Sequence, residues 1–207
     1  MTRRLPIFPL GTVLMPTQVL PLHIFEPRYR ELMAYLTAPG SVPELGVALI
    51  ERGHEVGGGD QRASVGTVAH LLESQELPDG RWLALFVGGD RFEVIRWLPD
   101  DPYPQAEVDD LPDPEWDPAD DGPLATAEEQ VRQAMALASE LGEAALRPDV
   151  AFSEDPARRA WELCAAAPLG PLDRQRLLGA STAVRLATLT EEVAEAKRVL
   201  AFRLGGG

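Results

Sequence analysis

A segment rich in acids and prolines divides this chain into two parts of different character. Between Trp97 and Val131 there are 12 acidic residues, no basic residues and seven prolines. Proline removes backbone hydrogen-bond donors and like charges repel one another, so much of this segment is predicted to be extended or mobile. The whole net charge of −14 falls on residues 97–154, because residues 1–96 sum to −2 and residues 155–207 to +2.

The sequence on either side of this segment differs in its pattern. The first part has short strand-like runs, and the last part has long helix-like runs. We therefore predict three regions: a β-rich domain at residues 1–111, an acidic, proline-rich linker at residues 112–124 and a helical domain at residues 125–207.

The first part is predicted to form many short strands, as in a sandwich or a small barrel. Leu77-Pro78-Asp79-Gly80-Arg81 predicts a hairpin turn, because proline presets φ, Asp79 can bond the backbone and Gly80 tolerates a positive φ. Gly88-Gly89-Asp90 predicts a second tight connection or a bulge. The expected strands are Leu5–Leu10, Val19–Phe25, Leu45–Glu51, Ser64–Ser74, Arg81–Val87, Arg91–Leu98 and Tyr103–Leu111.

Helices are predicted wherever capping signals precede apolar residues at helical spacing. Pro27 opens one such run inside the first part, with Tyr29, Leu32, Met33 and Leu36 on one face. In the last part, a capping box at Thr126–Glu129 predicts a helix reaching about Leu146. Further helices are expected over Asp155–Ala166, over Pro171–Leu178 and from Ser181 or Thr182 to Leu204.

Composition argues against several classes of protein. The acid excess disfavours a protein that binds nucleic acid or an anionic membrane through charge, and no apolar run is long enough to span a bilayer. The only lysine, Lys197, does not follow glycine, so there is no P-loop, and the histidines and the single cysteine lack metal-ligand spacing. Cys164 lies in an alanine-rich run and is interpreted as a small buried hydrophobe. We expect a cytoplasmic protein without a signal peptide, metal or cofactor.

The most distinctive motif lies near the start of the chain. It reads Leu20-Pro-Leu-His-Ile-Phe-Glu-Pro-Arg-Tyr-Arg-Glu-Leu-Met33 and follows Leu5-Pro-Ile-Phe-Pro-Leu10. Val65-Gly-Thr-Val-Ala69 and Gly89-Asp-Arg-Phe-Glu-Val94 continue the pattern. These motifs resemble the N-terminal, substrate-binding domain of Lon proteases, and the helical tail is similar as well, at Asp173–Leu178.

The resemblance implies an α+β fold, with an N-terminal PUA-like β-barrel followed by a C-terminal helical bundle. It also implies a non-catalytic module that holds unfolded or apolar protein segments in a groove between barrel and helices. Because no P-loop follows, we expect a stand-alone member without the ATPase and peptidase domains, acting as an adaptor for a separate ATP-dependent protease. Two alternatives stay open: an RNA-binding protein, since PUA-like barrels elsewhere bind RNA, and a hydrolase with an unrecognised site.

Most residues of the family signature have a structural interpretation, as strand-shaping, capping, core or turn residues. This set is Pro21, His23, Phe25, Glu26, Arg28, Tyr29, Gly66, Asp79, Gly80, Gly89, Arg91 and Phe92. Aromatic residues near the barrel edge and linker are better candidates for contact with a bound segment, because aromatics supply much of the energy at interfaces. They are Trp82, Phe86, Trp97, Tyr103 and Trp116, and a place in the core is equally compatible with Trp82 and Phe86.

Overall fold

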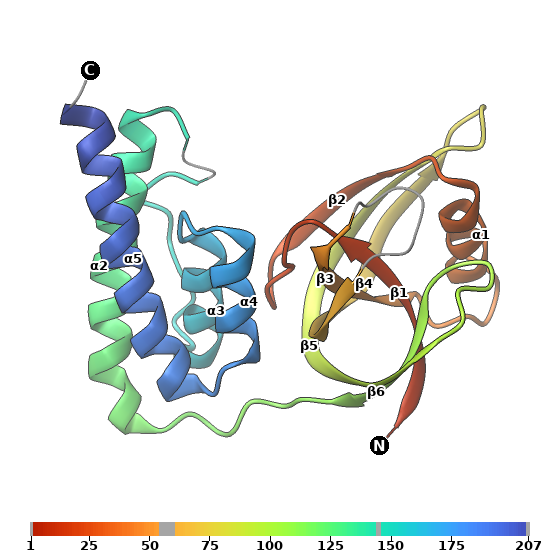
Figure 1. The fold of residues 1–207 in the computed structure, drawn as a ribbon, viewed down its shortest axis with the longest axis horizontal. Coiled ribbons are helices and arrows are strands. Elements are labelled where there is room, and N and C mark those ends of the chain that lie inside the picture. The colour runs from red at the N-terminus through yellow and green to blue at the C-terminus, as the bar shows by residue number, and fades with distance from the viewer. Residues whose placement is uncertain (1, 54–60, 144–145, 206–207) are drawn as a thin grey trace. The chain divides into compact units, whose positions relative to one another are not determined.

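The structure, a computed structural model, describes residues 2–53, 61–143 and 146–205. Within these residues it contains six β-strands, five α-helices and one short 3-10 helix, which confirms a mixed α+β fold. The chain forms two compact units, Met1–Pro112 and Asp113–Gly207 (Figure 1). The strands and the first helix belong to the first unit, and the other helices belong to the second.

The first unit is organised by the pairing of its strands. They are β1 (Arg3–Leu10), β2 (Val19–Ile24), β3 (Glu44–Arg52), β4 (Gln61–Glu76), β5 (Trp82–Leu98) and β6 (Gln105–Asp110). They pair in the order β2-β5-β4-β3-β1-β6, and β6 pairs again with β5. Five strands therefore form a closed ring of pairings, with β1 and β3 parallel and the others antiparallel. Strand β2 is attached to this ring through β5.

Strand β5 is one continuous strand where the sequence predicts two, Arg81–Val87 and Arg91–Leu98. The chain continues through Gly88 and Gly89, so the predicted tight connection is wrong and the alternative of a bulge is confirmed. Between the pairs Thr67↔Arg91 and Ala69↔Gly88, the register along β5 shifts by one residue. A Cβ on Gly89 would lie 2.4 Å from Nε2 of His70, so a larger residue there would require the His70 side chain to move.

The predicted hairpin turn joins β4 to β5. The amide of Gly80 donates to the carbonyl of Leu77 at 2.8 Å, and Gly80 has a φ of +77°. The Asp79 carboxylate accepts from the Arg81 amide at 3.1 Å. The same carboxylate pairs with the Arg81 guanidinium, and this hydrogen bond lowers the pKa of Asp79. The turn chemistry expected from the sequence is therefore present.

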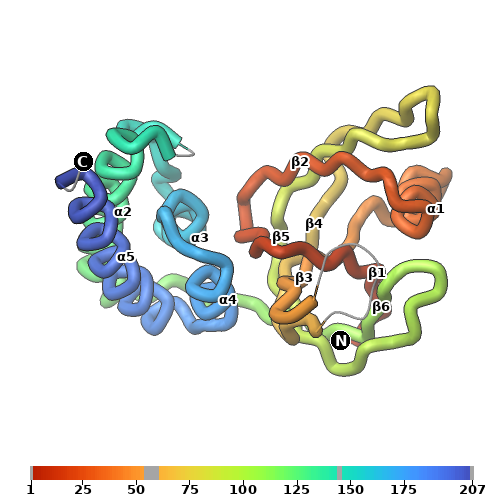
Figure 2. The backbone as a smooth tube through the Cα atoms, turned by 45° about the horizontal axis from the view of Figure 1, so that its top comes forward, coloured from red at the N-terminus to blue at the C-terminus, as the bar shows by residue number. Residues whose placement is uncertain are grey.

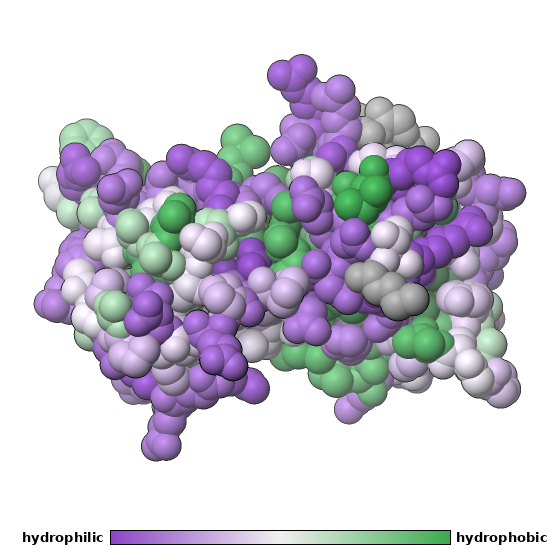
Figure 3. Space-filling view, turned by 90° about the horizontal axis from the view of Figure 1, so that it is seen from below, coloured by the Kyte–Doolittle hydropathy of each residue, from purple (hydrophilic) through white to green (hydrophobic). Residues whose placement is uncertain are grey.

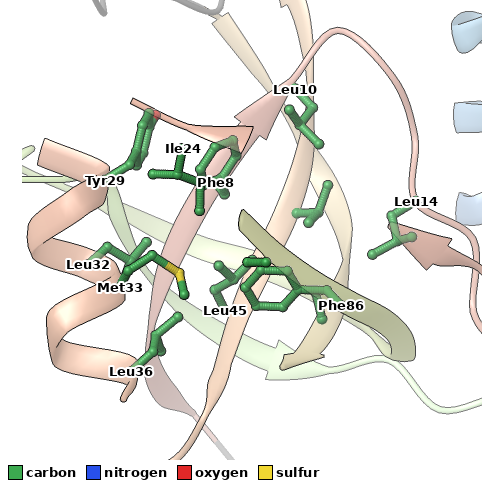
Figure 4. Close-up of a cluster of buried hydrophobic side chains, with 13 residues drawn as sticks. Phe8, Leu10, Leu14, Ile24, Tyr29, Leu32, Met33, Leu36, Leu45 and Phe86 are labelled. Carbon is green, nitrogen blue, oxygen red and sulfur yellow. The ribbon is translucent and has the colours of Figure 1, made fainter. Parts of the chain in front are cut away.

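Helix α1 (Pro27–Leu36) packs its apolar face against the core side of the sheet, as the helical spacing of its apolar residues predicts. Figure 4 shows Leu32, Met33 and Leu36 directed from the helix toward Leu45 and Phe86. The ring of Tyr29 stacks on Phe8, with 4.2 Å between centroids. A second cluster of buried residues lies within the same unit, and it consists of Leu5, Ile7, Ala48, Val68, Phe92, Ala106 and Val108.

The second unit consists of helices. They are η1 (Pro118–Asp120), α2 (Asp121–Glu140), α3 (Pro156–Ala166), α4 (Pro171–Gly179) and α5 (Thr182–Gly205). The long helices α2 and α5 run parallel and side by side (Figure 2). Lys197 of α5 donates to Gln130 of α2, and further along α5 Arg203 pairs with Glu143, which follows the end of α2. Helix α5 follows the predicted run from Ser181 or Thr182 to Leu204, and Leu186, Leu189, Val193 and Leu200 are buried on one face of it.

The predicted bounds of α2 are wrong at both ends. The helix begins at Asp121, and the hydroxyl of Thr126 bonds the carbonyl of Gly122 inside it instead of capping its start. Gly142 ends the helix with a φ of +74°. The Glu143 amide then donates to the carbonyl of Ala138, which is the bond of a Schellman motif.

One residue of the acidic segment, Asp113, is anchored by side-chain contacts. Asp113 accepts from the guanidinium of Arg185 at 2.6 Å and from the indole of Trp161 at 2.9 Å. Arg185 is 1% exposed, and its guanidinium lies 3.5 Å from the centre of the Trp161 ring. The first residue of the second unit is therefore bound to both α3 and α5.

Candidate functional site

One face of the sheet in the first unit exposes apolar side chains. Successive side chains of a strand point to opposite faces, and Ala84 and Phe86 of β5 are buried in the core. Leu83, Leu85 and Val87 therefore lie on the outer face, where Leu83 is 44% exposed. Because an antiparallel strand with one solvated face normally alternates apolar with polar residues, a strand that is apolar on both faces indicates a contact surface.

Strand β2 extends this outer face. The pairs Pro21↔Leu85 and His23↔Leu83 place two exposed residues of β2 beside the apolar residues of β5. Val19, at the start of β2, is 52% exposed. Apolar surface that reaches from one strand to the next is consistent with an extended ligand lying along the strands.

A hollow of about 570 Å³ lies on this surface. Its lining comes from β2, from β5 and from the part of β4 that leads to the hairpin turn. The lining contains a single carboxylate, that of Glu73, and no basic side chain. We call it the sheet-face site, and it consists of Pro21, Leu22, Glu73, Ser74, Gln75, Leu83, Ala84 and Leu85.

The four aromatic candidates in the first unit do not come together in one site. Phe86 is fully buried, so it supports the core and does not contact a ligand, as Figure 4 shows. Trp82 and Tyr103 are half-buried and pack against the same core cluster, and burial raises the pKa of Tyr103. Trp97 packs against the second cluster with the guanidinium of Arg62 over its ring. Trp116 belongs to the second unit, where its indole donates to Asp121 at 2.9 Å.

Several signature residues have the structural places expected for them. Gly66 lies against Phe92, where an added Cβ would come within 2.4 Å of the ring and of the Val47 carbonyl. Arg91 and Phe92 are buried. At the start of α1, Glu26 occupies the N-cap position and pairs with Arg28, whose guanidinium lies 4.5 Å from the Tyr29 ring centre.

Pro21 and Phe25 are exposed, against the expectation that they shape the strand and the core, and His23 between them is exposed as well. Phe25 is 53% exposed, and its ring meets that of His23 edge to face. Pro21 is exposed and lines the sheet-face site. Sequence reasoning missed Leu83 and Leu85 altogether. The available signal was the unbroken apolar run Trp82–Val87, which gives a strand two apolar faces.

The single cysteine is not placed as a nucleophile, and the described residues do not form a metal site. Cys164 is buried in α3, and desolvation raises the pKa of its thiol to about 12. Within residues 2–53, 61–143 and 146–205, no three His, Cys, Asp or Glu side chains are grouped so that they could hold a metal ion. No helix in the described parts of the chain is both long and apolar enough to cross a bilayer. The face in Figure 3 is largely hydrophilic, with hydrophobic residues in separate groups.

Comparison with known proteins shows what this architecture is similar to. The chain is 34% identical over 186 residues to Lon protease 2 of Herpetosiphon aurantiacus, a match that covers 86% of this chain and 22% of that protein. It is 31% identical to the Lon protease of Flavobacterium johnsoniae over 108 residues, or 52% of this chain and 13% of that protein. The chain thus spans about a fifth of the length of the first relative.

Solved structures agree with these sequence matches. The crystal structure of a Lon N-terminal domain protein from Xanthomonas campestris superposes with a TM-score of 0.61 at 26% identity, covering 90% of this chain and 96% of that one. The N-terminal domain of a Mycobacterium avium complex Lon protease has the same fold, with a TM-score of 0.65 over 93% of this chain and 98% of that one, at 19% identity.

A family model extends the likeness to nearly the whole chain. The model is described as the ATP-dependent protease La (LON) substrate-binding domain, and it matches residues 4–195. Both compact units fall largely within this match. The protein therefore belongs to the family of Lon substrate-binding domains.

Proposed function

We propose that this protein is a non-catalytic module that binds exposed apolar segments of unfolded proteins at the sheet-face site. The observation that carries the proposal is the apolar outer face of β5 in a chain of the Lon substrate-binding family. Folded proteins bury their apolar segments, so such a surface selects unfolded ones. Covering Leu83 and Val19 contributes about 1 kcal/mol each, so several contacts are needed for useful affinity.

The geometry favours an extended segment. Strand β2 stands at one end of the pairing order, so its outer edge offers backbone groups to a further strand. Pro21 has no amide hydrogen, so it cannot donate a backbone hydrogen bond to an added strand. This limits non-specific strand pairing at the edge of β2. Side chains of the segment would then lie beside Pro21 and reach across β2 toward Leu83 and Leu85, while its backbone follows the outer edge of β2.

The test is binding of a reduced and alkylated, permanently unfolded protein, compared with the same protein in its native form. We expect the unfolded form to bind and the native form not to bind. Leu83→Asp places a charge in the site and is expected to weaken binding at least tenfold, about 1.4 kcal/mol. Ile95→Asp is the matched control, because Ile95 lies on the same strand, is 55% exposed and is not part of the site. Equal weakening by both substitutions would remove the site from the proposal.

The finer architecture belongs to the same proposal. We infer that the closed ring of strand pairings is a PUA-like barrel and that the helices of the second unit form a bundle. The ring supports the first inference, and the parallel packing of α2 and α5 supports the second.

We also propose a partner for this module. The two relatives described above are Lon proteases much longer than this chain, so we propose that the module delivers segments to an ATP-dependent protease in the cytoplasm. Adding the protein to such a protease in trans should accelerate degradation of the unfolded probe. Leu83→Asp should abolish that acceleration.

A further inference from the structure

One row of side chains crosses the sheet-face site from the open edge of β2 to β4. The pairs Pro21↔Leu85 and Glu73↔Leu85 place these three residues side by side on three neighbouring strands. Paired residues of neighbouring strands point to the same face of a sheet, so all three lie on the outer face. The row therefore begins with two apolar side chains at the β2 side and ends in a carboxylate on β4.

The carboxylate of Glu73 is available to a ligand. The Glu73 side chain is exposed, and in the part of the chain that the structure describes its carboxylate forms neither an ion pair nor a hydrogen bond. No basic side chain lines the hollow, so Glu73 leaves the sheet-face site with a single uncompensated negative charge. A carboxylate at the end of an apolar row attracts a cation and repels a second carboxylate.

Lysine and arginine match this row because each carries its charge at the end of an apolar stem. In a segment that follows the outer edge of β2, a residue opposite Pro21 stands three strand spacings, about 14 Å, from Glu73. The stem of a lysine or arginine at that position would lie on Pro21 and Leu85. Its charge would then come within about 8 Å of the carboxylate, the distance over which an attraction persists in physiological salt.

The neighbouring row has a different end on β4. It consists of His23, Leu83 and Gln75, through the pairs His23↔Leu83 and Gln75↔Leu83, and lies two residues further along β2. This row ends in a neutral amide, which has no charge to attract a cation. The two rows together therefore distinguish positions along a bound segment. A basic residue is favoured opposite Pro21 and is not favoured opposite His23.

We propose that Glu73 is a specificity-determining residue of the sheet-face site, which selects apolar segments containing a lysine or arginine over those containing an acidic residue. This inference rests on the proposed function. It adds a substrate class, because burial of apolar surface alone does not distinguish a basic segment from an acidic one. The effect of the single carboxylate is expected to be about threefold in affinity, since an exposed charge pair contributes little.

The test compares three fluorescein-labelled peptides by fluorescence anisotropy with the full chain. Each peptide has leucine two positions before and two positions after a central arginine, glutamine or glutamate, with serine between, so that the leucines and the central side chain share one face of an extended segment. The whole chain is acidic, so a general preference for the arginine peptide is expected in every variant. The quantity measured is therefore the change that a substitution causes in the ratio of arginine-peptide to glutamate-peptide affinity.

Glu73→Gln is expected to lower this ratio about threefold. Gln75→Glu places a carboxylate at the end of the second row and is expected to raise the ratio by a similar factor. Glu76→Gln is the matched control, because it changes the net charge by the same amount, alters an exposed residue of the same strand and lies outside the lining of the hollow. Added salt should reduce the effects of Glu73→Gln and Gln75→Glu.

An equal change of the ratio with Glu73→Gln and Glu76→Gln would overturn the proposal, because it would assign the preference to net charge. If the three peptides bind and Glu73→Gln leaves the ratio unchanged, this inference fails while the proposed function stands. If none of the three peptides binds, the proposed function fails and the selectivity of Glu73 fails with it. Circular dichroism of each variant confirms that the first unit is intact.

Discussion

The two units join distant parts of the chain in different ways. In the first, the start and end of the unit are joined by backbone pairing, as in Arg3↔Val108 and Leu5↔Ala106 between β1 and β6. In the second, the start of the unit is joined to α5 by one carboxylate, that of Asp113, which receives hydrogen bonds from Arg185 and Trp161. The first connection consists of backbone hydrogen bonds, whereas the second is made by side chains.

This difference determines which substitutions each unit tolerates. A side chain on a paired strand can change without removing the backbone bonds, unless the new atoms collide with the neighbouring strand. A carboxylate that neutralises a buried guanidinium has no substitute, because an unpaired buried charge is costly. We therefore expect substitutions that remove side-chain atoms to destabilise the second unit more strongly. Substitutions that add side-chain atoms are expected to destabilise the first unit more strongly.

The largest effect is expected from Asp113→Ala. It leaves the guanidinium of Arg185, which is 1% exposed, with backbone carbonyls and the Trp161 ring as its remaining contacts. Breaking a buried ion pair costs about 3–5 kcal/mol, and since a quarter of the Asp113 side chain is exposed we expect about 3 kcal/mol. Urea unfolding followed by the helix signal at 222 nm measures it.

Glu115→Ala is the control for this substitution, because it removes an exposed carboxylate two residues further along the same acidic segment. Its expected effect is below about 0.5 kcal/mol. If the two variants lost the same stability, the carboxylate of Asp113 would have no special place, and the contrast between the units would fail.

The second-largest loss of stability is expected in the first unit, from a substitution that adds a methyl group. Gly66→Ala would place a Cβ 2.4 Å from the Val47 carbonyl, which belongs to the neighbouring strand and cannot move aside. Overpacking of this kind costs about 2 kcal/mol. Gly122→Ala in α2 meets nothing within 4 Å and is expected to be neutral or slightly stabilising, as measured by the same unfolding experiment. A destabilisation by Gly122→Ala that matched that of Gly66→Ala would contradict the contrast.

The parts of the fold that depend on neighbours in sequence could be predicted, and the parts that depend on distant residues could not. The hairpin turn at Pro78–Arg81 and the buried face of α1 follow from residue types a few positions apart. The anchoring of Asp113 depends on Arg185, 72 residues away, and no local pattern indicates it. The acidic segment was therefore interpreted from its charge and its prolines, which suggested an extended or mobile segment.

The candidate site was missed for a related reason. Aromatic residue type predicts large contact area but not the face of the strand on which the ring lies. Phe86 and Leu83 lie on opposite faces of β5, and only the packing of α1 against one face determines which of them is buried. Once that face is known, the alternation along β5 identifies Leu83 and Leu85 directly.

The smallest effect concerns pH and again distinguishes the second unit. Burial raises the pKa of the Cys164 thiol from 9.0 to about 12, whereas the unfolded chain releases this proton at its ordinary value. The stability that depends on the protonated thiol is therefore complete below pH 9 and is lost as the pH rises toward 12. At pH 10 the expected loss is about 1.4 kcal/mol.

Comparison with Cys164→Ala isolates this contribution, since the other groups that titrate at high pH are the same in both proteins and cancel in the difference. The difference in unfolding free energy between the two proteins should be constant from pH 7 to 8.5 and should then shift in favour of Cys164→Ala by up to about 1.4 kcal/mol per pH unit. A difference that stayed constant to pH 10 would mean that the thiol ionises as easily in the folded unit as in the unfolded chain. The interior around α3 would then be open to water. Arg185 would in that case not be a buried charge that depends on Asp113.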